Sequence, residues 1–167
     1  WLGREYILKE KDSQGIRTLT GHLEMPSAKW PDERSASRRF IARAYRALRD
    51  FQEAKRWLYG AIFECPSIRE PYWELAQLGY HLEDWPLTYF AATGGLAVTN
   101  RTDSYLVESA AWGEGLWDLA AVSAYRLGML PKSLEYADRA LNLAPDDARL
   151  QNNRRLIGEA LRKEEEK

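Results

Sequence analysis

The sequence SASRRFIARAYRALRDFQEAKRWLYGAIFECP, at residues 35–66, has the pattern of two helices joined by a short turn. Residues 69–100 repeat this pattern, because Asp84-Trp85 lies 34 residues after Asp50-Phe51. A third copy ends at Pro145. Self-similarity at a fixed period predicts an array of stacked helical hairpins. In such an array the surface carries the function, and a buried catalytic centre is not expected.

Individual positions resemble the tetratricopeptide repeat, which places small residues where two helices cross and bulky residues where they interlock. The second copy departs from the pattern, because Gly94-Gly95 costs roughly 1 kcal/mol per glycine relative to alanine and Asn100 replaces the final proline. The resemblance implies an all-α fold. Its architecture would be a right-handed superhelix, also called an α-α solenoid, with a carboxyl-terminal capping helix. The first copy matches at Arg38, Ile41, Ala42, Tyr45, Ala54, Leu58, Ala61 and Pro66, and the third at Trp117, Ala120, Ala121, Ala124, Ser133, Ala137 and Pro145.

The spacing of the repeat-ending prolines predicts an insertion. Pro66 and Pro145 lie 79 residues apart, which is two periods of 34 plus 11 residues. The extra residues, at 103–113, include Tyr105 and Trp112 and are too apolar for a solvated loop, so we expect them to fold back onto the array. The expected parts are a partial hairpin at 1–30, repeats at 31–66, 67–102 and 114–147, the insertion at 103–113, and a capping helix with its tail at 148–167.

Helix-breaking residues and apolar periodicity place the individual helices. Two prolines in the loop at 25–31 separate the first hairpin from the next. In the last helix, Leu150, Leu156, Ile157 and Leu161 are expected on the buried face. The expected helices span about 2–11, 13–24, 33–48, 51–64, 69–82, 85–98, 115–127, 131–143, and from 146 or 147 to 163.

Length, charge and cysteine content narrow the classes of function. A chain of 167 residues predicts one domain with one core. The formal net charge of −1, from 24 basic and 25 acidic residues, gives no general attraction to nucleic acid. No stretch has the apolar length of a membrane-spanning helix. Cys65 is the only cysteine, which fits a reducing compartment, so we expect a cytoplasmic protein.

The residues that most often carry chemistry are sparse here. His22 and His81 are the only histidines, and neither has a cysteine or histidine at metal-ligand spacing. His81 beside Asp84 is interpreted as a pair that stabilises a turn, and Cys65, just before Pro66, as a packing residue. We therefore expect no catalytic residue, no metal and no cofactor in this segment.

A groove lined by the first helix of each hairpin is the expected interaction surface. Arg39, Arg43 and Arg46 form a basic stripe at helical spacing, which suits an acidic peptide, a chain-terminal carboxylate or an anionic sugar phosphate. The likeness to carboxylate-clamping repeats is partial, because Glu74 stands where those proteins have asparagine. The alternative is that the arginines pair with nearby acidic groups. The remaining groove candidates are Trp73, Gln77, Tyr80, Asp118, Tyr125, Asn152 and Asn153.

Two tryptophans lie outside the regular repeat positions. Trp30 precedes Pro31, and Trp112 lies in the insertion. Exposed aromatic residues are frequent anchors at protein interfaces. Both are therefore candidates for docking against another domain or subunit, with simple capping of the core as the alternative.

Several short motifs resemble the repeat region that follows the catalytic domain of bacterial family 2 glycosyltransferases. Leu2-Gly3-x2-Tyr6 matches an element inside a repeat helix, so we expect the chain to be part of a longer polypeptide. The resemblance implies a non-catalytic module that positions a domain or binds a protein, such as its own upstream catalytic domain. The alternatives are that the groove forms part of that enzyme's acceptor site, or that the chain is a stand-alone adaptor or co-chaperone. The resembling segments are 2–6, 30–34, 69–72, 117–119, 124–128 and 144–153.

Overall fold

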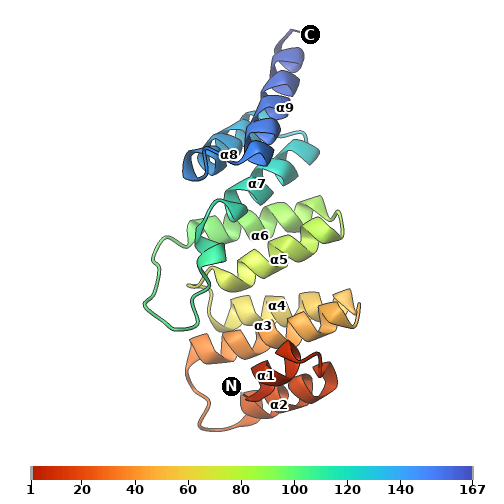
Figure 1. Cartoon of the computed structure of the whole chain (residues 1–167), viewed down its shortest axis with the longest axis vertical. Helices are drawn as coiled ribbons and strands as arrows, with labels where there is room; N and C mark the ends of the chain where they lie inside the picture. Colours follow the sequence, from red (N-terminus) through yellow and green to blue (C-terminus); the bar gives the residue numbers. More distant parts are fainter. Residues whose placement is uncertain (1, 167) are drawn as a thin grey trace. The chain divides into compact units, whose positions relative to one another are not determined.

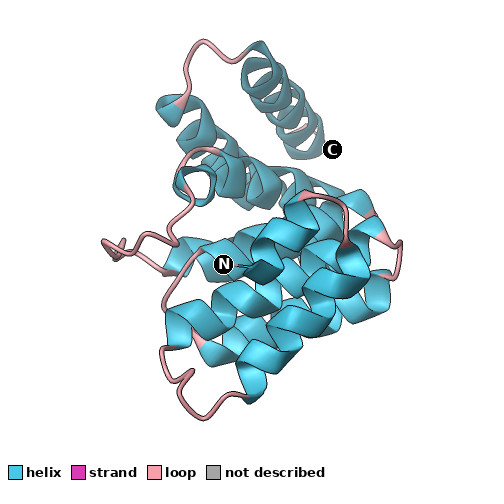
Figure 2. Ribbon diagram, turned by 60° about the horizontal axis from the view of Figure 1, so that its bottom comes forward, coloured by secondary structure: helices cyan, strands magenta, loops and turns pink. Residues whose placement is uncertain are grey.

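The computed structural model describes residues 2–166, and in this range all regular structure is helical (Figures 1 and 2). The ends of most helices lie within two residues of the expected ends. The exception is α1, which ends at Leu8 instead of residue 11. The elements are α1 Leu2–Leu8, α2 Asp12–Glu24, α3 Pro31–Ala47, α4 Phe51–Glu64, α5 Glu70–His81, α6 Trp85–Ala97, a 3₁₀ helix η1 Ser109–Trp112, α7 Gly115–Arg126, α8 Leu130–Leu143 and α9 Ala148–Glu165.

The turn inside each hairpin has a recurring geometry. One residue adopts a left-handed conformation, and the next residue donates its backbone N–H to a carbonyl five residues earlier, as from Asp50 to Tyr45 and from Asp84 to Gly79, both at 2.9 Å. This turn explains the early end of α1, because the left-handed residue there is Glu10. The four residues are Glu10 (φ 56°), Arg49 (φ 61°), Glu83 (φ 54°) and Gly128 (φ 77°).

The repeated aspartates begin the second helices of two hairpins. The side chain of Asp50 accepts a hydrogen bond from the backbone N–H of Glu53, and that of Asp84 accepts one from Leu87, each at 3.1 Å. Such a bond satisfies a backbone donor that has no partner within the helix, and it contributes about 1 kcal/mol. The 34-residue spacing of these aspartates therefore reflects helix capping.

The chain forms two compact units instead of the single core expected from its length. Unit 1 extends to Leu75 and includes Asn100–Val107, and unit 2 comprises Ala76–Thr99 and the residues from Glu108 onward. In unit 1, α2 packs against both α1 and α3, and α3 packs against α4. In unit 2, α7 packs against α6 and α8, and α8 packs against α9. Each unit thus stacks helices that are consecutive in the chain.

Small residues allow close helix contacts in both units. Ala54 and Ala61 of α4 are fully buried, and the backbone carbonyl of Ala61 accepts a 2.9 Å hydrogen bond from the Ser35 hydroxyl of α3. In unit 2, Ser133 of α8 makes the same kind of bond to the carbonyl of Ala121 in α7, at 2.8 Å. Related polar contacts therefore join the two helices of both hairpins.

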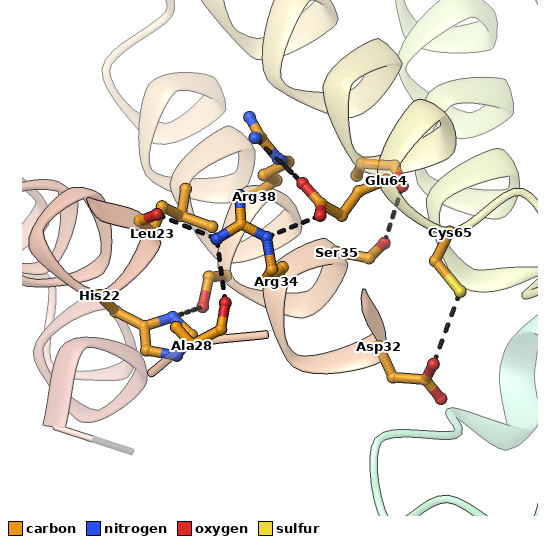
Figure 3. A network of polar contacts seen from close by, with 11 residues as sticks. His22, Leu23, Ala28, Asp32, Arg34, Ser35, Arg38, Glu64 and Cys65 are labelled. Carbon is orange, nitrogen blue, oxygen red and sulfur yellow. Dashed lines mark hydrogen bonds and ion pairs between the residues drawn. The ribbon is translucent and has the colours of Figure 1, made fainter. Parts of the chain in front are cut away.

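An arginine network fixes the loop between α2 and α3 (Figure 3). Arg34 donates to the backbone carbonyls of Leu23 at 2.9 Å and Ala28 at 3.1 Å, while its Nε lies 2.6 Å from Glu64 of α4. Arg38 also pairs with Glu64, at 3.1 Å. The hydrogen bond from Arg34 is the main cause that lowers the pKa of Glu64. One guanidinium thus connects α2, the loop and the second helix of the next hairpin.

Part of the insertion packs against the beginning of α3. The Tyr105 hydroxyl donates a 2.6 Å hydrogen bond to Glu33, and its ring lies 5.8 Å from that of Trp30. This hydrogen bond raises the pKa of Tyr105 to about 12, with smaller effects from burial and the Glu33 charge. Leu106 packs on the apolar cluster that contains Leu19 of α2. Residues 100–107 therefore belong to unit 1, although they follow α6 in the chain.

Helix α9 covers the last hairpin with a narrower apolar face than expected. Ile157 is 4% exposed and packs with Ala121 and Ala137, and Leu150 is also buried. Leu156, which was expected on the same face, is 44% exposed. The side chain of Asp147 begins the helix by accepting from two backbone N–H groups, at 2.8 and 3.2 Å. The carboxyl-terminal helix thus caps the array mainly through Leu150 and Ile157.

Candidate functional site

The first two arginines of the expected basic stripe share one carboxylate. Arg39 Nε lies 2.6 Å from Oε1 of Glu74, and Arg43 contacts the same carboxylate through Nε at 3.1 Å and Nη2 at 2.8 Å. The side chains of Arg39 and Glu74 are 1% and 3% exposed, whereas that of Arg43 is 31% exposed. Arg39 and Arg43, which lie four residues apart on α3, thus face α5 within unit 1.

This ion-pair cluster places the Arg39 side chain in the interior of unit 1. A guanidinium that is 1% exposed does not line an open groove, and it is already paired with Glu74. Removing one partner from such a buried pair typically costs 3–5 kcal/mol, because the remaining charge stays desolvated. Arg39 therefore stabilises the contact between α3 and α5. The pairing agrees with the alternative in which the arginines meet nearby acidic groups.

The other groove candidates of unit 1 are half-buried. Arg46 lies near the carboxyl end of α3, and Trp73 lies in the first turn of α5. Neither residue is part of the Glu74 contacts described above. The basic stripe thus consists of two arginines held by Glu74 and a third, Arg46, further along the helix.

In unit 2 the structure brings two of the predicted residues into direct contact. Asp118 of α7 accepts a 3.0 Å hydrogen bond from the side-chain amide of Asn153 in α9. Its other oxygen accepts a hydrogen bond from Arg149 at the beginning of α9. Asp118 is 8% exposed, whereas the Arg149 side chain is 57% exposed. Asp118 thus holds the start of α9 while the arginine reaches solvent.

The electrostatics of Arg149 connect this cluster to α5. Burial lowers the pKa of Arg149, but the hydrogen bond and charge of Asp118 outweigh it, with smaller contributions from Asp147 and Tyr80, so that the net shift is upward. The phenol of Tyr80 is therefore near enough to act on this guanidinium.

Two exposed tyrosines accompany the cluster. Tyr80 is 47% exposed and Tyr125 is 40% exposed. Tyr125 lies seven residues after Asp118, which places both on one face of α7. Gln77 lies three residues before Tyr80 on α5 and is half-buried. We refer to the residues Gln77, Tyr80, Asp118, Tyr125, Arg149 and Asn153 as the tyrosine face.

The sequence interpretation missed Arg149 in this region. Arg149 was interpreted as part of a capping helix, although an arginine four residues before Asn153 falls on the same helix face. Arg126, next to Tyr125, has its guanidinium carbon 5.0 Å from the centre of the Trp85 ring. Trp85 in turn meets Tyr80 edge-on at 5.8 Å. Asn152, the remaining candidate, is exposed and accepts a hydrogen bond from Arg155 at 3.0 Å.

Metal-ligating side chains do not cluster within residues 2–166. In that range, no three residues among histidine, cysteine, aspartate and glutamate form a possible metal site. Cys65 is buried, and burial is the main cause that raises the pKa of its thiol. His22 Nδ1 forms a 2.9 Å hydrogen bond with Ser37. Over the same residues, no helix combines the length and apolarity needed to cross a membrane.

Comparison with known proteins establishes the class of fold. No family model and no curated protein matches the sequence. Solved structures do: a crystal structure of MamA superposes with a TM-score of 0.72 at 15% identity, covering 98% of this chain and 88% of that one. The first tetratricopeptide domain of human RPAP3 gives 0.61 at 16% identity, covering 79% of this chain and 95% of that domain. The chain therefore has a tetratricopeptide repeat fold.

One similar structure includes a ligand. The first tetratricopeptide domain of RPAP3 bound to the HSP90 peptide SRMEEVD gives a TM-score of 0.62 at 16% identity. The match covers 76% of this chain and 92% of that domain. At this level of identity the likeness concerns the fold and not the residues that bind the peptide.

Proposed function

We propose that this chain is a non-catalytic protein-interaction module whose tyrosine face binds an extended polypeptide. The observation that carries the proposal is the exposure of Tyr80 on α5 and Tyr125 on α7, together with the side chains of Asp118 and Asn153, which their mutual hydrogen bond fixes. Tyrosine offers a large apolar ring and a polar hydroxyl at a small cost in conformational entropy, which makes it a frequent interface residue. The ordered polar groups supply hydrogen bonds that fix the register of a peptide backbone.

The charge of the tyrosine face favours a ligand without strong net charge. Arg149 is offset by Asp118 and lies 3.7 Å from Asp147, so its pairing leaves little uncompensated positive charge. Its exposed guanidinium still has the geometry to donate to peptide carbonyls. We therefore propose a neutral or mixed-charge peptide segment as the ligand of this face.

An acidic peptide or a chain-terminal carboxylate was the ligand expected from the basic stripe. Glu74 weighs against this ligand at Arg39 and Arg43, because an incoming carboxylate would meet the resident one. Arg46 is the arginine of the basic stripe outside that pairing. The RPAP3 complex supports a polypeptide as the general ligand class. The complex does not indicate which peptide charge this chain prefers.

The motifs at residues 2–6 and 144–153 support a second, more specific proposal. They resemble the repeat region of bacterial family 2 glycosyltransferases, so the module would position an upstream catalytic domain or contribute to its acceptor site. The lone, buried Cys65 supports a cytoplasmic location. Sequencing the gene upstream of Trp1 tests the attachment. Several hundred codons of alternating strands and helices with paired aspartates support it, whereas a start codon within about forty residues supports the stand-alone adaptor.

Selection from a peptide-display library tests the interaction function. We expect the parent chain to select peptides that the double variant Tyr80→Ala/Tyr125→Ala binds at least about 30-fold more weakly, because central interface aromatics often contribute 2 kcal/mol or more. Tyr59→Ala is the matched control, since Tyr59 is a tyrosine of similar exposure, 45%, on a second helix of unit 1. Equal binding by the parent and the double variant would contradict the proposal.

A further inference from the structure

A cavity of about 470 Å³ opens on unit 1 and shares no lining residue with the tyrosine face. Its walls come from α1, α2 and α3, and Tyr105 and Leu106 of the insertion complete them. Ligand pockets in proteins typically measure roughly 300–1,000 Å³. The cavity is therefore large enough for an amino-acid side chain and part of its backbone.

The floor of the cavity is apolar. Leu19, Ala36 and Phe40 line it and belong to the buried cluster of unit 1, and Leu106 packs on the same cluster. The polar groups of the wall come mainly as pairs that satisfy each other. His22 Nδ1 forms a 2.9 Å hydrogen bond with the Ser37 hydroxyl, and the Tyr105 hydroxyl donates a 2.6 Å hydrogen bond to Glu33. Because these polar demands are already met, the space favours an apolar occupant.

Positive charge borders the aromatic floor. Arg4 lines the cavity, and its guanidinium carbon lies 5.4 Å from the centre of the Phe40 ring. Guanidinium groups donate hydrogen bonds and accept none. An apolar side chain in the cavity would therefore place the carbonyl oxygens of its own backbone near donors. A polypeptide offers both an apolar side chain and carbonyl oxygens, whereas a pure hydrocarbon offers only apolar atoms.

One side of the cavity is lined by a loop residue, Tyr105. Tyr105 is 55% exposed, and its described contacts include the 2.6 Å hydrogen bond to Glu33 and the ring contact with Trp30. Trp30 also lies in a loop and is 42% exposed. The sequence marked both the insertion and Trp30 as features outside the regular repeat. The structure places them together at the edge of the cavity.

We propose that this cavity binds one aromatic or branched aliphatic side chain of an extended partner peptide, with Tyr105 closing over it. The size, the apolar floor and the Arg4 guanidinium define the ligand, and the hydrogen bond from Tyr105 to Glu33 holds the cover in place. This site rests on the proposed function only in that the partner is a polypeptide. It shares no residue with the tyrosine face.

The test uses the whole chain, ¹⁵N-labelled, with capped pentapeptides that carry phenylalanine, leucine or glycine at the centre of four alanines. We expect saturable amide shifts at residues 18–22, 36–40 and 104–107 with the phenylalanine and leucine peptides. The glycine peptide should bind at least about ten-fold more weakly, because the pocket would stay empty. Absence of binding by all three peptides overturns the proposal. Equal binding by N-acetyl-phenylalanine amide overturns the peptide part of it.

A variant that fills the cavity sharpens the test. Gly21 lines the cavity, and a side-chain carbon added there meets no atom within 4 Å, so Gly21→Phe should occupy the space without disturbing α2. Gln14→Phe is the control, since Gln14 is exposed on the same helix and outside the cavity lining. We expect Gly21→Phe to abolish peptide binding and Gln14→Phe to retain it. Binding by Gly21→Phe at the parent level refutes the assignment.

Two further variants separate this site from the tyrosine face. Tyr105→Phe keeps the ring but removes the hydrogen bond to Glu33, so peptide dissociation should accelerate at least about three-fold. Unchanged dissociation would show that Tyr105 does not close over the ligand. Tyr125→Ala should leave binding at the cavity unchanged, because Tyr125 lies in unit 2. Loss of both binding reactions in Tyr125→Ala would show that the two sites are not independent.

Discussion

Replacing Glu74 with glutamine removes the carboxylate that Arg39 and Arg43 share. Arg39 would then remain 1% exposed without the carboxylate that lies 2.6 Å from its Nε. Breaking a buried pair in this way costs about 3–5 kcal/mol. The contribution of Arg43 is smaller, because its side chain is 31% exposed and water screens its charge. We therefore expect Glu74→Gln to lower the free energy of unfolding by about 3 kcal/mol or more.

Urea unfolding followed by circular dichroism measures this change from the midpoint at constant slope. For a chain of this length, 3 kcal/mol corresponds to a fall in Tm of roughly 6–12 °C. Glu135→Gln is the control, because the Lys132–Glu135 pair is more than half exposed and should contribute less than about 1 kcal/mol.

Replacement of both buried charges provides a second test of the same reasoning. Arg39→Met/Glu74→Leu removes the buried charges together, and an apolar substitute for an ion pair is often neutral or stabilising. We expect this double variant to be more stable than Glu74→Gln, despite the lost partner of Arg43. The reasoning is refuted if Glu74→Gln loses less than about 1 kcal/mol, or if the double variant is the less stable of the two.

Two smaller predictions concern a helix crossing and a titration. Gly79→Ala should destabilise unit 2 by roughly 1–3 kcal/mol in urea unfolding, because the added carbon would lie 2.9 Å from the backbone nitrogen of Thr88. Gly158→Ala, whose contacts are 3.8 Å or longer, should not destabilise it. Tyr105 should ionise near pH 12 by ultraviolet titration and nearer 10 in Glu33→Ala. Because the pKa of Tyr105 is raised in the folded protein, the stability that this pair contributes is present below pH 10 and lost as pH rises toward 12. Identical titration of Tyr105 in the parent and in Glu33→Ala would contradict this.

The helices were predictable because their signals are local. The aspartates at positions 50 and 84 accept the capping hydrogen bonds that a helix start requires, and the spacing of apolar residues sets the length of each helix. The end of α1 was missed because Glu10 takes a left-handed conformation that glycine or asparagine normally signals. The division into two units was also missed, since length alone carries no information about where contacts become sparse.

The candidate site was harder to predict because side-chain partners lie far apart in the chain. Arg39 and Glu74 are 35 residues apart, so a helical stripe of arginines cannot reveal whether a carboxylate lies opposite it. Asp118 and Asn153 are also 35 residues apart. Both were proposed individually as groove residues, but the hydrogen bond between them could not be predicted from the sequence. The apolar character of the insertion predicted that it folds back, but not that Tyr105 would meet Glu33.

The central claim is that first helices of unit 2 carry the polypeptide-binding surface. Its most direct test is a titration of the ¹⁵N-labelled chain with a peptide selected by display, followed through the amide shifts of α5–α9. We predict the largest shifts at Gln77, Tyr80, Tyr125 and Asn153, and small shifts along the second helices α6 and α8. Shifts concentrated on α6 and α8, with Tyr80 and Tyr125 unchanged, would contradict the account.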